Sequence, residues 1–172
     1  MIAIYIQKFL IRKLKTAKLS RKDFAELSGI SYRTICDLLT ATKPKPELMT
    51  IIKIADSFNC SVDEVINRKK FNAKPGGYKT NLSTAQIMNY LRKYLTKKVH
   101  EHSITPSKLS RTIRFSSASI SEFIKDNASQ KTLGSIITIA LADYFAVSVD
   151  EMIGRTTINQ SKDKVYDKEM SL

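Results

Sequence analysis

The chain has 172 residues, which is enough for one domain of ordinary size or for two small ones. Hydrophobic residues make up 42% of the sequence, so a packed core is expected and a wholly disordered chain is excluded. Lys and Arg number 29 against 16 Asp and Glu, a formal net charge of +13. This excess favours a polyanionic partner, nucleic acid first and an anionic membrane surface second.

Membrane insertion and secretion are not expected. No apolar run approaches the ~18–20 residues that a membrane-spanning helix needs. The apolar opening segment, Met1–Leu14, is interrupted by Lys8, Arg12 and Lys13, and no small-residue cleavage site follows it. The 2 cysteines are too few for a disulfide scaffold, so we expect a cytoplasmic protein with reduced thiols.

The sequence contains an internal repeat. The segment 61–68, SVDEVINR, returns as SVDEMIGR at 148–155, a shift of 87 residues. Upstream, the apolar skeleton returns with a shift of 85 residues, which predicts an insertion near Asp126–Gln130. We therefore expect two tandem copies of one small domain, at residues 1–68 and 84–155.

Two segments lie outside the predicted copies. Residues 69–83 combine Pro75-Gly76-Gly77 with repeated lysines and lack apolar periodicity, so they are expected to form a basic linker. Residues 156–172 are polar and are expected to form a tail.

The first copy shows helical spacing from its beginning. Apolar residues recur every three or four positions over the first helix, at Ile2, Ile6, Phe9, Leu10 and Leu14. Ser20 is expected to cap a second helix with Phe24, Ala25 and Leu27 on its inward face. Gly29 is expected to end that helix.

Three further helices are predicted in the first copy. Ser31 is expected to cap a third helix that turns Ile35, Leu38 and Leu39 inward. A fourth has an apolar face at Leu48, Ile51, Ile52, Ile54 and Ala55. Ser61-x-x-Glu64 has the pattern of a capping box for a short fifth helix, and the pattern recurs at Ser148-x-x-Glu151 and Ser83-x-x-Gln86. No segment alternates with period two, so the predicted fold class is all-α.

A short helix, a turn near Gly29 and a second short helix over residues 21–39 form a helix-turn-helix pattern. With its flanks, the string LSRKDFAELSGISYRTICDLL at residues 19–39 resembles the Xre/Cro-type family of phage-repressor helix-turn-helix domains. The resemblance covers the whole first copy and, more loosely, the second. It implies two tandem five-helix domains that bind double-stranded DNA and pair as a homodimer.

The resemblance implies that the exposed start of the third helix faces base edges. The corresponding residues are Tyr32, Arg33 and Thr34, with Asp37 one turn later and Ser31 near a phosphate. Arg33 is the strongest candidate, because a guanidinium can bond both acceptors of a guanine. Phosphate contacts are expected from Arg21, Lys22, Lys43 and Lys45. For each of these cations an ordinary solvated surface position is the alternative.

The second copy departs from the family pattern. Arg114 stands where the first copy has Gly29, so a residue with a side chain is expected to adopt positive φ or the turn to differ. The aligned outward positions include Ser117 and Ser119, which offer no bidentate fork for a base. Phosphate contacts through Ser107 and Lys108 stay open, and so does a role in pairing.

The sequence therefore predicts a DNA-binding transcriptional regulator, a repressor that acts by occupying an operator. An antitoxin of a toxin pair, or an interaction module that no longer binds DNA, are the alternatives. No catalytic grouping, cofactor site or metal site is predicted: His100 and His102 lack companion ligands, and Cys36 is expected to be a semi-buried apolar residue.

Overall fold

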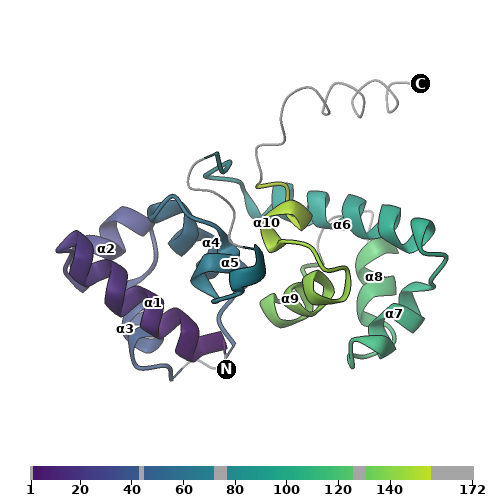
Figure 1. Ribbon diagram of the computed structural model, residues 1–172, viewed down its shortest axis with the longest axis horizontal. Helices are drawn as coiled ribbons and strands as arrows, with labels where there is room; N and C mark the ends of the chain where they lie inside the picture. The colour runs from purple at the N-terminus through teal and green to yellow at the C-terminus, as the bar shows by residue number, and fades with distance from the viewer. Residues whose placement is uncertain (1, 43–44, 72–76, 126–130, 156–172) are drawn as a thin grey trace.

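Figure 1 shows a computed structural model of the chain, in which residues 2–42, 45–71, 77–125 and 131–155 are described. The regular structure of these residues is helical and includes no strand, so the all-α prediction is confirmed. We call residues 2–71 the N-terminal half and residues 84–155 the C-terminal half.

The N-terminal half begins with a long helix and continues with shorter ones. Its elements are α1 (Ile2–Ala17), α2 (Arg21–Ser28), α3 (Tyr32–Leu39), α4 (Leu48–Ser57), α5 (Val62–Val65) and the 3-10 helix η1 (Lys69–Phe71). The C-terminal half has its helices in the same order. They are α6 (Thr84–Glu101), α7 (Pro106–Thr112), α8 (Ser119–Lys125), α9 (Ser135–Tyr144) and α10 (Val149–Met152).

The apolar residues predicted to face inward form the core of the N-terminal half. Ile6, Ile35 and Ile51, from α1, α3 and α4, are each fully buried. The ring of Phe58 stacks on Phe24 at a centroid distance of 5.2 Å and meets Phe9 edge-on at 5.8 Å. These aromatic contacts fix α2 against α1 and the end of α4, so the short α2 is held by tertiary packing rather than by its own length.

The prediction is wrong for one core residue, Leu27. Leu27 was expected on the inward face of α2, but it is 60% exposed, while Phe24 is fully buried. The helix has only eight residues and contacts its neighbours along a narrow face, so Leu27 lies on the rim. It lines a shallow surface pocket together with Met49 and Leu82.

Side-chain caps begin most of the predicted helices. Ser20 and Ser83 each form a complete capping box, with Asp23 and Gln86 as the reciprocal partners. At α5, Ser61 accepts a hydrogen bond from the Glu64 amide, but the Glu64 carboxylate pairs with Lys13 Nζ at 3.1 Å. The predicted box at this helix is therefore a single serine cap.

Parts of the predicted linker, residues 69–83, are structured and contact the two halves. Its first residues form η1, and the Lys79 amide donates to the Arg155 carbonyl at 2.8 Å. The Asn81 amide donates to Asp56 Oδ2 at 3.2 Å. This part of the segment therefore packs onto both halves, because it has polar partners in each. Residues 72–76, the predicted insertion at 126–130 and the predicted tail at 156–172 lie outside the described residues.

Candidate nucleic-acid interface

The helix-turn-helix of the N-terminal half is built from α2 and α3. The Ser20 side chain accepts from the Asp23 amide at 3.2 Å, while the Ser20 amide donates to Asp23 Oδ2 at 3.0 Å. Hydrogen bonds with the Ser20 hydroxyl and amide hold the pKa of Asp23 below its ordinary value. A charged carboxylate in the first turn of α2 stabilises the helix through its dipole.

The turn between the two helices depends on Gly29. Its φ of 61° is left-handed, as predicted, and a Cβ built there would meet no atom closer than Lys53 Nζ at 4.0 Å. The glycine is therefore required for its backbone conformation and not for space. Lys53 Nζ, from α4, donates to the Gly29 carbonyl at 3.0 Å and holds the end of α2.

The outer face of α3 presents the residues predicted to face bases. Ser31 caps the helix by accepting from the Thr34 amide at 3.2 Å. Tyr32 is 54% exposed and Arg33 is also exposed, whereas Thr34 and Asp37 are half-buried. Ile35 and Leu38 on the opposite face are buried. The start of α3 is thus free to enter a groove while its other face is fixed.

Two residues that the sequence did not single out hold this arrangement. Gln7 Nε2, on α1, donates to the Leu39 carbonyl at 2.8 Å and anchors the last turn of α3. Lys53, described above, anchors the turn before α3. A lone glutamine or lysine on a helix face carries no sequence signal for such a contact, so pattern analysis had no means of finding either.

The cations predicted to contact phosphate lie around this helix pair. Arg21 and Lys22 are exposed at the start of α2, and Lys45 is exposed in the segment between α3 and α4. Arg21 Nη1 lies 3.8 Å from Cys36 Sγ on α3, so the guanidinium lies beside this helix. Lys43 lies outside the described residues.

The corresponding region of the C-terminal half has a different surface. Arg114 adopts φ of 63°, so the turn keeps the left-handed geometry without glycine. The helix that follows begins at Ser119 and not at Ser117, which lies exposed in the preceding turn. Of the two aligned serines, Ser119 therefore opens the helix, where it is half-buried.

Lys131, which follows α8, is one of several cations of the C-terminal half that have a carboxylate partner. Lys131 Nζ pairs with Glu122 Oε2 at 2.8 Å, and this hydrogen bond lowers the pKa of Glu122. Lys108 is exposed on α7 beside the half-buried Ser107. In the full sequence, residues 1–83, which are the N-terminal half and the connecting segment, carry a net charge of +9, and residues 84–172 carry +4. The first part of the chain therefore has the stronger electrostatic attraction for DNA.

The remaining candidate groups show no chemistry of their own. The His102 ring lies 5.6 Å from the Phe145 ring, and the described residues contain no cluster of metal-ligating side chains. Cys36 is half-buried, and burial raises the pKa of Cys60 to about 12. Among the described residues no helix is both long and apolar enough to cross a membrane.

Comparison with known proteins agrees with the geometry of α2 and α3. Residues 10–70 match the Cro/C1-type HTH DNA-binding domain. An uncharacterized HTH-type transcriptional regulator from Rickettsia conorii is 43% identical over 74 residues, which cover 41% of this chain and 68% of that protein. One from Rickettsia prowazekii is 42% identical over 74 residues, covering 41% of this chain and 80% of the relative.

No solved structure is significantly similar to the chain. The family match covers the N-terminal half, where the capped helices, the left-handed glycine and the exposed start of α3 occur together. The chain belongs to the Cro/C1-type helix-turn-helix family of DNA-binding proteins.

Proposed function

We propose that the protein is a DNA-binding transcriptional regulator that contacts base edges with the start of α3. The observation that carries this proposal is the division of α3 into two faces. Tyr32 and Arg33 are exposed, while Ile35 and Leu38 are buried against the rest of the N-terminal half. A helix held in this way can present its first turn to a major groove without losing its packing.

The residues around α3 supply the contacts that orient it. Arg21 and Lys22 stand at the N-terminus of α2, where the helix dipole also favours a phosphate. Lys45, and Lys43 by its place in the sequence, follow α3 and are suited to the neighbouring backbone. These contacts position the helix and carry no sequence information, whereas Arg33 can bond O6 and N7 of a guanine.

We further propose that the regulator is a repressor. With α3 in the groove and the flanking cations on phosphates, the bound protein would occlude its operator and exclude polymerase by steric overlap. The C-terminal half adds Lys108 and Ser107 as phosphate contacts and has no guanidinium at the positions aligned with Tyr32 and Arg33.

Binding of the full chain to duplex DNA as a function of salt tests the proposed function. The logarithm of the binding constant should fall linearly with the logarithm of salt concentration, with a slope of about −0.9 for each phosphate contacted. Lys45→Ala should flatten that slope by about one and weaken all sequences alike.

A matched control is Lys93→Ala, because Lys93 is exposed on α6 outside the proposed interface. This variant should leave the slope unchanged. Binding that shows no sequence preference and little response to salt would contradict the proposal and favour an interaction module.

A further inference from the structure

The two copies of the repeated SVDE motif meet at the centre of the molecule. The short helices α5 and α10, which these motifs open, pack against each other, and α3 and α8 lie on opposite sides of this contact (Figure 1). The motif singled out by the sequence repeat therefore lies in the contact surface between the two halves.

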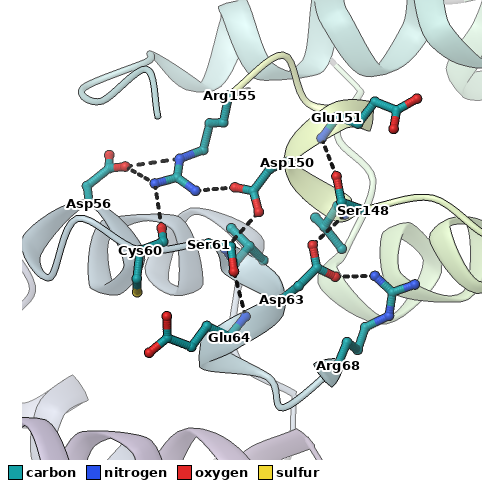
Figure 2. A network of polar contacts seen from close by, with 12 residues as sticks. Asp56, Cys60, Ser61, Asp63, Glu64, Arg68, Ser148, Asp150, Glu151 and Arg155 are labelled. Atoms are coloured by element: carbon teal, nitrogen blue, oxygen red, sulfur yellow. Dashed lines mark hydrogen bonds and ion pairs between the residues drawn. The ribbon is translucent and has the colours of Figure 1, made fainter. Parts of the chain in front are cut away.

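The motif carboxylates exchange backbone hydrogen bonds. Asp63 Oδ2 accepts from the Val149 amide at 2.9 Å, and Asp150 Oδ2 accepts from the Val62 amide at 2.9 Å (Figure 2). Both aspartates are almost fully buried, at 0% and 1% exposure. Each carboxylate therefore satisfies an amide at the start of the other half's helix, where the helix dipole favours negative charge.

The arginines that close the motifs repeat the same exchange. Arg155 pairs with Asp150 in its own half, and across the contact with Asp56 and the Cys60 carbonyl. Its counterpart Arg68 pairs in turn with its own Asp63, and across the contact with Asp143 and the Val147 carbonyl. Each cross-contact partner in one half stands 87 residues from its equivalent in the other.

The contact of Asp63 with Val149 is repeated by their equivalents, Asp150 and Val62. Such a reciprocal exchange is the pattern of a two-fold symmetric subunit interface. We infer that this chain uses such an interface internally: its two halves pair with each other as the subunits of a dimer would. One chain then carries both helix-turn-helix units in a fixed arrangement, in place of the homodimer that the sequence resemblance implied.

The segment that connects the two halves, residues 77–83, makes the internal pairing asymmetric, because it covers Arg155. The Tyr78 ring lies 5.1 Å from the Arg155 guanidinium, and Lys79 and Asn81 bond Arg155 and Asp56 through their amides. The Arg155 side chain is fully buried as a result, whereas its counterpart Arg68 is 11% exposed.

The inference has a consequence for DNA that rests on the proposed function. A symmetric homodimer presents two identical recognition helices and selects a palindrome. This chain presents α3, with Tyr32 and Arg33, and α8, with Ser117 and Ser119 before or at its start. We expect an operator with one base-specific half-site beside one that is bound through its phosphates.

Sedimentation equilibrium of the unmodified full chain tests the internal pairing without DNA. The expected mass is that of one chain, 19.5 kDa, across the micromolar range. Twice that mass would overturn the inference. Because no DNA is present, this result is independent of whether the proposed function holds.

Amide hydrogen exchange tests the contact itself. The Val62 and Val149 amides should be protected to the same degree in dilute and concentrated samples, because their acceptors lie in the same chain. Asp150→Asn should speed exchange at Val62, in the other half, and Asp23→Asn, the matched control in α2, should leave both amides unchanged. The inference would be overturned if protection of these amides fell on dilution, or if exchange at Val62 were the same in Asp150→Asn as in the unmodified chain.

A titration of duplex DNA with the full chain completes the test. One chain per operator is expected, and two chains per operator would contradict the internal pairing. If no DNA is bound at all, the proposed function fails, while the mass and the exchange rates still decide the pairing.

Discussion

The helix pairs α2–α3 and α7–α8 follow one plan and present different surfaces. In each half the long helix that precedes the pair donates a hydrogen bond to the last helix of the pair. Gln7 Nε2 of α1 donates to the Leu39 carbonyl of α3, and Arg92 Nε of α6 donates to the Phe123 carbonyl of α8. In each half the intervening turn is left-handed, at Gly29 and at Arg114. The scaffold is thus kept, while the outward residues differ.

The proposed function assigns specificity to the exposed positions of these helices. Buried positions decide whether the second helix is held, and both halves satisfy that requirement with Ile35 and Ile120, each fully buried. Exposed positions decide what the helix can contact, and there Tyr32 and Arg33 align with Ser117 and Ala118. Under the proposed function, sequence preference would therefore follow a few exposed side chains of these helices.

The largest expected effect is on stability, from the two closing arginines. Arg155→Ala should lower the free energy of unfolding by ~3–5 kcal/mol, because it leaves Asp150 buried without its cation. Arg68→Ala likewise leaves the buried Asp63 without its cation, but it should lower the free energy of unfolding less. Its cross-contact partner Asp143 is 63% exposed and stays hydrated, whereas Asp56, the cross-contact partner of Arg155, is 15% exposed. Urea denaturation of both variants measures the difference, and an equal or larger loss for Arg68→Ala would contradict the expected order.

The second effect is on DNA affinity. Arg33→Ala should weaken binding to the preferred sequence by ~1–3 kcal/mol, because a bidentate contact to a base is lost. The matched change Ser119→Ala in α8 should alter affinity little. Fluorescence anisotropy at fixed salt concentration compares them, and a larger loss for Ser119→Ala would move the base contacts to the C-terminal half.

The third effect concerns the two turns. Gly29→Ala should lower the free energy of unfolding by ~1–2 kcal/mol, because φ of 61° strains any residue with a Cβ. Arg114→Gly should raise it by less than ~1 kcal/mol, because relief of the strain is offset by the freer unfolded chain. Thermal unfolding of the two variants measures both changes in the free energy of unfolding. No change for Gly29→Ala would mean that the turn relaxes to another geometry.

The smallest effect is on pH dependence, because carboxylates with opposite shifts offset each other. Burial, together with the charge of Asp150, raises the pKa of Asp63 to about 6, against the pull of Arg68. A raised pKa in the folded state means that this group's contribution to stability is present below about pH 4 and is lost as the pH rises through about 6.

Carboxyl carbon NMR should give a titration midpoint of about 6 for Asp63 and one below the ordinary value for the exposed Asp23. An ordinary midpoint for Asp63 would show that its burial at the α5–α10 contact is incomplete.

Much of the local structure could be predicted from the sequence, because it depends on nearest neighbours. The serine caps at Ser20 and Ser31, the glycine turn and the buried faces of α1, α3 and α4 follow from spacing and residue type. The exposure of Leu27 did not follow, because it depends on how far the short α2 is rotated against its neighbours.

The contact between the halves could not be predicted, although its residues were in view. Asp63 and Asp150 lie in the repeated motif, and a charged residue of this kind in a short helix ordinarily faces solvent. Only the tertiary arrangement gives each carboxylate an amide from the opposite half beside the arginine of its own half. The repeat showed that these positions match and gave no sign that they meet.

Selection of bound sequences from a random DNA library, with the full chain and with Arg33→Ala and Ser119→Ala, tests whether α3 makes the base contacts. The unmodified chain should select one defined half-site motif, Arg33→Ala should lose preference at one or two base pairs of it, and Ser119→Ala should select the same motif. A motif that survives Arg33→Ala and changes with Ser119→Ala would contradict the assignment of base contacts to α3.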